Sequence, residues 1–185
     1  MKTLFIDTHG ELLRIFYVDD DNLVKCEKES QHGHSEIAIN TIEEVLKSAK
    51  CEVNELDQII VVVGPGSFTG VRIGVTIAKT IAYTLSIPIK TITSLEMYGV
   101  SVEEPFDIIA IKDSKGYYSA RYKDGKFCDY SYAKESDFDK YISSNGFKMI
   151  IGESVDIHKV LDYLGTSEFV NPHLVNPIYI KELNL

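Results

Sequence analysis

Short hydrophobic runs separated by polar turns make up the first 30 residues. Residues 4–6, 12–18 and 23–28 are rich in β-branched and aromatic side chains, and the polar stretches Thr8–Gly10 and Asp19–Asn22 separate them. Runs of this kind with turn-forming residues between them predict strands. Because the turns are too short for crossover helices, the three strands are expected to form an antiparallel meander.

The pattern then changes to helical and alternates with strands. Apolar positions at helical spacing predict a helix over residues 35–50, with Ser35 near its start. Residues 59–63 form a continuous β-branched run, which is typical of a strand that is covered on both faces and lies inside a sheet. A glycine-rich turn over 64–70, a long helix to about Ser86 and a strand over 87–93 follow.

The chain becomes polar around Ser101–Pro105, and this is the expected domain boundary. Beyond it the order partly repeats, with strands over 107–111, 117–123 and 126–130, a polar segment, a strand over 148–151 and a helix over 155–164. The sequence therefore predicts an α/β protein with two related subdomains, residues 1–103 and 104–185, of which the second is smaller.

Charge and cysteine content narrow the function classes. The 185 residues include 19 Lys and Arg against 28 Asp and Glu, a net charge of −9. So acidic a surface repels phosphate backbones, and we expect no binding of nucleic acid by the chain alone. Three cysteines without a CxxC pair suit free thiols in a reducing compartment. No stretch predicts a signal peptide or a membrane span, so a cytoplasmic protein without membrane contact is expected.

The glycine turn follows a buried strand and opens a helix, an arrangement that can hold an anion. A Walker A loop would need Lys and then Ser or Thr after the last glycine, but Val71 and Arg72 stand there. The spacing of Gly64, Gly66 and Gly70 is closer to a dinucleotide fingerprint, although no acidic residue closes the next strand. An enzyme that uses Gly64–Gly70 to hold the phosphates of a nucleotide or dinucleotide stays open as the alternative function.

A stripe of small residues runs along the helix behind this turn. Gly70, Gly74, Ala78 and Ala82 are spaced by four, and Ile73, Ile77 and Ile81 form an apolar stripe beside them. Small side chains let another helix approach closely. The neighbour is either the helix over residues 35–50 of the same chain or a helix of a partner, and we favour an interface with a partner. Replacement of Gly74 by Leu or of Ala78 by Arg is then expected to abolish the complex while leaving the fold intact.

These residues resemble the signature of the bacterial TsaB (YeaZ) family. The signature loop comprises Gly64, Pro65, Gly66, Ser67, Phe68, Thr69, Gly70 and Arg72, and Gly74, Ala78–Lys79 and Ile87–Pro88 follow it. The opening Phe5–Thr8, the stretch Gln31–Ser35 before the first helix, Ser94–Glu96, Gly152 and Asn176–Tyr179 agree as well.

The resemblance implies the actin and sugar-kinase ATPase fold, built from two ribonuclease-H-like subdomains with the second reduced. It also implies a non-catalytic subunit of the complex that makes N6-threonylcarbamoyladenosine beside the anticodon of tRNAs reading codons that begin with A. Its partners would be a TsaD-like catalytic subunit and, through the complex, a TsaE-like ATPase and tRNA, with a homodimer when TsaD is absent. The interface implied comprises Gly70, Ile73, Gly74, Ile77, Ala78, Ile81 and Ala82 with Ile37 and Thr41 of the first helix.

The same resemblance indicates which chemistry is missing. Ser94 and Tyr98 stand where the TsaD relative has two metal-binding histidines, so neither a metal site nor catalysis is expected. Asp7 and Thr8 would form a vestigial first phosphate loop. No cofactor is expected, and any nucleotide binding would be weak and incidental.

Overall fold

The computed structural model describes residues 1–20, 22–29, 34–145, 147–165 and 167–180, without the side chains of residues 34 and 35. The chain divides into two compact units. Unit 1 comprises Met1–Ile92 and Ser167–Pro177, and unit 2 comprises Thr93–Thr166 and Ile178–Leu185. The boundary predicted at residue 103 is therefore about ten residues too late. The helix that follows residue 93 packs on elements of unit 2, and the chain returns to unit 1 near its end.

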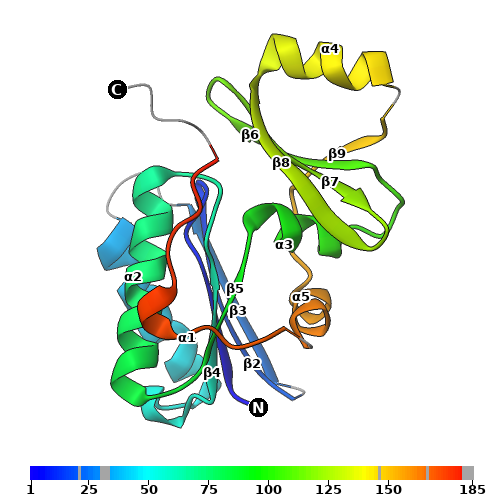
Figure 1. The fold of residues 1–185 in the computed structure, drawn as a ribbon. Coiled ribbons are helices and arrows are strands. Elements are labelled where there is room, and N and C mark those ends of the chain that lie inside the picture. Colours follow the sequence, from blue (N-terminus) through cyan, green and yellow to red (C-terminus); the bar gives the residue numbers. More distant parts are fainter. Residues whose placement is uncertain (21, 30–33, 146, 166, 181–185) are drawn as a thin grey trace. The chain divides into compact units, whose positions relative to one another are not determined.

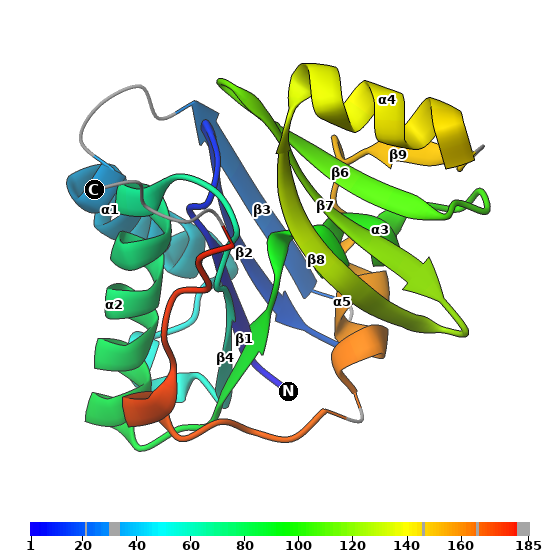
Figure 2. The ribbon, with the colours of Figure 1, turned by 45° about the horizontal axis from the view of Figure 1, so that its top comes forward.

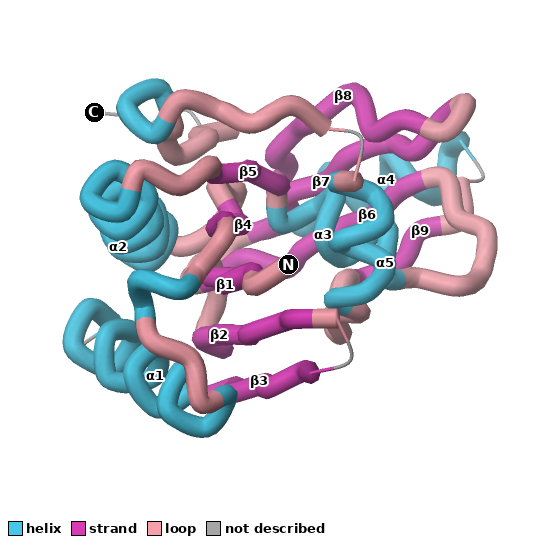
Figure 3. The backbone as a smooth tube through the Cα atoms, turned by 90° about the horizontal axis from the view of Figure 1, so that it is seen from below, coloured by secondary structure: helices cyan, strands magenta, loops and turns pink. Residues whose placement is uncertain are grey.

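The sheet of unit 1 (Figure 1) has five strands: β1 (Thr3–Asp7), β2 (Leu12–Asp19), β3 (Asn22–Glu29), β4 (Gln58–Val62) and β5 (Ile89–Ile92). Their order is β3-β2-β1-β4-β5 (Figure 3). The first three strands pair antiparallel, and β4 pairs parallel to both β1 and β5. The predicted meander is therefore correct, and the β-branched run does lie inside the sheet. A short 3₁₀ helix, Val53–Glu55, precedes β4.

Two helices cover one side of these strands (Figure 3). They are α1 (His34–Ala49) and α2 (Phe68–Leu85), which contact each other. Alternate residues of the strands, such as Leu4, Ile15 and Val61, enter the same buried core as Val71, Val75 and the other inward residues of the helices. The segment Gln31–Gly33, part of the expected entry into α1, lies outside the described residues.

The C-terminal part of unit 1 packs on α2 and β5. Val170 forms a single antiparallel bridge with Ile89, and the 3₁₀ helix Pro172–Leu174 follows it. The Lys79 ammonium donates to the carbonyl oxygens of His173 and Val175 at 3.3 and 2.8 Å. Val175 is 2% exposed and belongs to the core. This segment therefore covers one flank of α2.

The sheet of unit 2 has four strands: β6 (Ile108–Asp113), β7 (Gly116–Lys123), β8 (Lys126–Lys134) and β9 (Met149–Ile151), in the order β8-β7-β6-β9. This repeats the order of the first four strands of unit 1 without the fifth. Two ribonuclease-H-like sheets, the second reduced, are the arrangement expected for the actin and sugar-kinase ATPase fold, so the predicted fold class is confirmed.

Three helices pack in unit 2 (Figure 2). They are α3 (Ser94–Ser101), α4 (Glu135–Asn145) and α5 (Ile157–Leu164). Helix α4 contacts β7 and β8 and buries Phe138 against Ile108 and Tyr117, while α3 contacts β6, β7 and α5. None of the helices in the described part of the chain is long and apolar enough to cross a membrane.

Candidate functional site

The turn between β1 and β2 is buried and internally bonded. Asp7, Thr8 and His9 are each 2% exposed or less. One oxygen of the Asp7 carboxylate accepts from the backbone N–H of His9 at 3.0 Å and contacts its Nδ1 at 2.6 Å, and the other accepts from Nη1 of Arg14 at 3.0 Å. Arg14 also pairs with Glu27, 3.2 Å away. Both oxygens of the carboxylate proposed for a vestigial phosphate loop are thus bound by the chain itself.

These partners set the protonation of the buried carboxyl group. Burial alone would raise the pKa of Asp7, because it penalises the charged form. The charge and hydrogen bond of His9 and the charge of Arg14 outweigh burial and hold the pKa of Asp7 below its ordinary value. The turn therefore carries a buried, ionised carboxylate held by the ring of His9 and the guanidinium of Arg14.

The signature loop closes over the turn at backbone level. The N–H of Ser67 donates to the carbonyl oxygen of His9 at 2.7 Å. A Cβ atom at Gly66 would lie 2.3 Å from that oxygen, so this approach requires glycine. Gly64 needs glycine for another reason, a φ of 92°. Ser67 then caps α2 by accepting from the N–H of Gly70 at 3.2 Å. The glycines of this loop thus serve a close contact with Thr8–His9.

The small-residue stripe of α2 faces the interior of the chain, and the prediction that it is an open partner surface is wrong. Added Cβ atoms at Gly70 and Gly74 would lie 2.1 and 2.3 Å from the carbonyl oxygen and Oγ1 of Thr8. The Thr8 hydroxyl also donates to the carbonyl of Gly70 at 2.7 Å. Ala78 and Ala82 are fully buried in the core of unit 1. Small side chains are needed here because helix and turn approach so closely.

Two further predictions change with this finding. Gly74→Leu or Ala78→Arg would disturb the fold itself, because each added side chain enters occupied space. Thr41 of α1, expected at the interface, is also fully buried. The sequence predicts the wrong neighbour for this stripe, because four-residue spacing identifies a face of a helix but does not say what covers it.

The outward side of α2 is formed by other residues. Ile73, Ile77 and Ile81 are half-buried beside the core, as is Ile37 of α1. Polar side chains are exposed next to them, namely Thr69, Arg72, Thr76, Thr80 and Thr84, together with Tyr83 at 63% and Phe68 at 42% exposure. We call Ile73, Ile77, Ile81, Thr76 and Thr80 the outer face of α2. Its isoleucines are the part of the predicted interface that reaches the surface, and its threonines were not among the predicted interface residues.

Ser94 and Tyr98 lie four residues apart on α3, and both are buried. Helix α3 begins with a capping box in which Glu96 accepts from the N–H and hydroxyl of Thr93 at 2.8 Å each. Tyr163 donates to the other oxygen of Glu96 at 3.3 Å, and burial together with this carboxylate raises the pKa of Tyr163 to about 12. Among the described residues, no group of three or more His, Cys, Asp or Glu could hold a metal ion.

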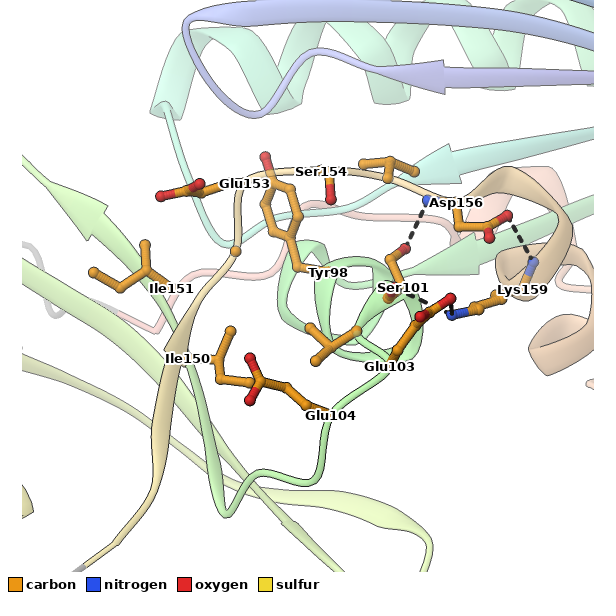
Figure 4. A pocket seen from close by; sticks show the side chains of 13 residues that line it. Tyr98, Ser101, Glu103, Glu104, Ile150, Ile151, Glu153, Ser154, Asp156 and Lys159 are labelled. Atoms are coloured by element: carbon orange, nitrogen blue, oxygen red, sulfur yellow. Dashed lines mark hydrogen bonds and ion pairs between the residues drawn. The ribbon is translucent and has the colours of Figure 1, made fainter.

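Unit 2 contains an open pocket that the sequence did not predict (Figure 4). It lies between α3 and the segment from β9 to α5, and Glu103, Glu104, Glu153 and Asp156 contribute carboxylates to its lining. Several of these are engaged already: Lys159 pairs with Glu103 at 3.4 Å, Lys148 pairs with Glu104 at 2.7 Å, and Asp156 caps α5. Acidic residues are frequent both before residue 58 and after residue 95, so no sequence signal singles out this group.

Fold and site together define a chain with the actin-like ATPase fold, whose first hairpin turn is closed by its own signature loop. The profile of the TsaD family, described as tRNA N6-adenosine threonylcarbamoyltransferase, matches residues 27–114. The TsaB protein of Bacillus subtilis, named for tRNA threonylcarbamoyladenosine biosynthesis, is 39% identical over 97 residues, which are 52% of this chain and 42% of the relative. A TsaB protein of Buchnera aphidicola is 30% identical over 133 residues, 71% of this chain and 57% of the relative.

A solved structure agrees over a longer stretch. A Pseudomonas aeruginosa protein described as similar to peptidase YEAZ superposes with a TM-score of 0.78 at 15% identity, covering 97% of this chain and 99% of that one. The matches support the assignment of the chain to the TsaB/YeaZ family. The chain spans about half the length of the curated TsaB relatives that it matches.

Proposed function

We propose that this chain is the non-catalytic TsaB-type subunit of the complex that makes N6-threonylcarbamoyladenosine in tRNA, and that it binds and supports the TsaD-type catalytic subunit. The observation that carries the proposal is the outer face of α2, half-exposed and apolar, in a chain whose relatives are named for this biosynthesis. A TsaE-type ATPase and tRNA would join through the complex, and two copies would pair through the same face when the partner is absent.

The closed turn supports a non-catalytic role. A nucleotide at the first hairpin would need open backbone N–H groups for its phosphates and a carboxylate available to its magnesium ion. Here His9 and Arg14 hold both oxygens of Asp7, and Ser67 and Gly66 contact the His9 carbonyl. The same contacts use the Gly64–Gly70 loop for packing, which disfavours the alternative of a nucleotide- or dinucleotide-dependent enzyme. We therefore propose that no cofactor is bound at this loop.

The exposed residues of α2 and α1 indicate where the partner would bind. This surface suits a helix of another protein, because the half-exposed isoleucines lose their remaining contact with water when such a helix covers them. Ile73 and Ile77 stand beside the core, so their outer sides can be covered without unfolding α2. Ile37 extends this surface onto α1.

Long charged side chains on the outer face test this proposal. Thr76→Arg and Thr80→Arg place a bulky cation at exposed positions, where the fold tolerates it within about 0.5 kcal/mol. We expect each variant to lose co-purification with a TsaD-type protein from the same organism, and to keep the thermal unfolding midpoint of the unmodified protein. Ser143→Arg on exposed α4 is the matched control and should bind normally.

Normal binding by both threonine variants would contradict the proposed surface. The enzyme alternative has its own test, a calorimetric titration of the chain with ATP and with NAD. Micromolar binding that is lost in Ser67→Ala would favour the alternative.

A further inference from the structure

The two most exposed large apolar side chains in the described part of the chain lie at neighbouring places in unit 1. Leu174 of the C-terminal 3₁₀ helix is 70% exposed, and Tyr83 near the end of α2 is 63% exposed. The ring of Tyr83 meets the ring of His173 edge-on, with centroids 4.8 Å apart, and Leu174 directly follows His173. The 3₁₀ helix lies beside α2 in Figures 1 and 2 and contacts it. Exposed apolar side chains that gather at one place indicate a binding surface, whereas single ones do not.

The C-terminal segment of unit 1 holds Leu174 in a fixed position. This segment is tied to α2 by the two hydrogen bonds of the Lys79 ammonium and to β5 by the bridge between Val170 and Ile89. Val175, the next residue, is 2% exposed and belongs to the core. Because the segment is anchored on both sides of Leu174, a partner that covers this side chain loses less conformational entropy than it would on an unanchored segment.

Charged side chains are missing from the two stretches that carry these residues. Residues 80–89 and 169–177 contain no Asp, Glu, Lys or Arg, although 25% of the chain is charged. Depletion of charge together with exposed aromatic and aliphatic side chains is typical of the centre of a protein interface. A nucleic acid fits these stretches poorly, because contacts to its phosphates rely on Lys and Arg. The composition therefore favours a protein partner.

Tyr83 continues the outer face of α2. It lies three residues after Thr80 and seven after Thr76, so the three side chains share one side of the helix. All three are exposed. A helix that covers Thr76 and Thr80 is about 10 Å wide with its side chains, and it would reach Tyr83 if it followed α2 for two turns. The protein that binds the outer face would then also meet the C-terminal segment beside Tyr83.

We propose that Tyr83 and Leu174 extend the surface that binds the TsaD-type partner, and that an apolar part of the docked partner covers both side chains. This inference rests on the proposed function and adds the C-terminal segment to the site on α2. Tyrosine is among the residues that contribute most to binding at protein interfaces, because it buries a large area with few rotatable bonds. Tyr83 is therefore the expected anchor, and Leu174 the apolar side chain beside it.

Binding kinetics against an immobilised TsaD-type protein from the same organism test this extension. Tyr83→Ala and Leu174→Ala should each weaken binding about 10-fold or more, mainly through faster dissociation. The loss should be the same at about 50 and about 500 mM salt, because the contact is apolar. Tyr83→Phe keeps the ring and should bind within about twofold of the unmodified chain.

Two controls show that the fold is intact and the effect local. Both side chains are mostly exposed, and alanine favours the helix, so the alanine variants should keep the thermal unfolding midpoint of the unmodified protein. Tyr141 on α4 is 43% exposed and lies in unit 2. Tyr141→Ala removes a similar side chain away from the proposed surface and should leave the binding kinetics unchanged.

The outcomes separate this inference from the proposed function. If Thr80→Arg abolishes binding while Tyr83→Ala or Leu174→Ala stays within twofold of the unmodified chain, the extension is refuted and the proposed function stands. Weaker self-association of the alanine variants in light scattering, with unchanged binding to the TsaD-type protein, would overturn the extension in favour of a second copy of this chain. Failure of the unmodified chain to bind the TsaD-type protein would overturn the proposed function, and the extension with it.

Discussion

The two hairpin turns at equivalent places in the two units differ sharply. In unit 1, Asp7–Gly10 follows the central strand β1 and is almost entirely buried through His9. In unit 2, Asp113–Gly116 follows β6, which has the corresponding place in its sheet, yet Ser114 and Lys115 are exposed. The same strand order therefore produces a closed turn in one unit and an open turn in the other.

The loop and helix that follow the fourth strand of each unit explain why one turn is buried and the other exposed. In unit 1, β4 leads through the glycine loop into α2, whose glycines contact Thr8 and whose loop contacts His9. In unit 2, β9 leads through Gly152 to α5, which is only eight residues long and contains no glycine. Closure of the first turn thus depends on the small residues of one helix and loop, and the sheet alone does not produce it.

Asp7→Ala is the substitution expected to destabilise the closed turn of unit 1 most strongly. It removes the carboxylate that pairs with buried Arg14 and leaves that charge poorly compensated, at a cost of about 3–5 kcal/mol in the free energy of unfolding. Urea denaturation measures the loss. Ser114→Ala in the open turn of unit 2 should stay within about 0.5 kcal/mol of the unmodified protein. Equal effects of the two substitutions would show that the buried pair does not hold the closed turn.

Gly70→Ala tests the close approach of helix and turn with a single methyl group. The added Cβ would lie 2.1 Å from the Thr8 carbonyl oxygen, so α2 must shift, and we expect a loss of about 2–3 kcal/mol. Gly10→Ala in the same turn is the control, because the nearest atom would be 4.0 Å away. A Gly70→Ala protein as stable as the Gly10→Ala protein would mean that the turn and helix are not in tight contact.

The pH dependence of the unfolding free energy tests the charge of Asp7, and its expected effect is smaller than those of the two substitutions. Since the folded pKa of Asp7 lies below its unfolded value of about 3.9, the unfolded chain binds more protons between these two values. The stabilisation from Asp7 is therefore present above about pH 4 and is lost as the pH falls towards the folded pKa. Unfolding free energies between pH 2 and 6 should converge for the unmodified protein and Asp7→Asn as the pH falls. Parallel curves would argue against an ionised, paired carboxylate.

Much of the fold could be predicted from hydrophobic spacing. The strands and helices of unit 1 follow the predicted ranges closely, because each has a clear period and ends at a turn. Two helices were missed. Helix α4 has only Phe138 buried, so its polar sequence reads as a loop. Helix α3 buries residues on several sides, so it lacks the one-sided pattern that identifies a surface helix.

The candidate site was harder to predict, for a physical reason. The sequence identified the signature loop, the Asp7–Thr8 turn and the small stripe separately. It could not show that Gly70 and Gly74 contact Thr8, because that contact joins residues more than 60 positions apart. Glycine spacing is the same whether a helix packs on a partner or on its own chain, and only the three-dimensional arrangement separates the two.

Thiol labelling of α2 tests the central claim that its small stripe packs inward and its outer face accepts the partner. Cysteine would be introduced at Ala78 or at Thr80 in a Cys26→Ser, Cys128→Ser background, with Cys51, 6% exposed, as the buried reference. The Thr80→Cys thiol should react rapidly in the free chain and be protected in the complex, while Ala78→Cys should react as slowly as Cys51 in both. Rapid labelling of Ala78→Cys in the free chain, suppressed by the partner, would contradict the account.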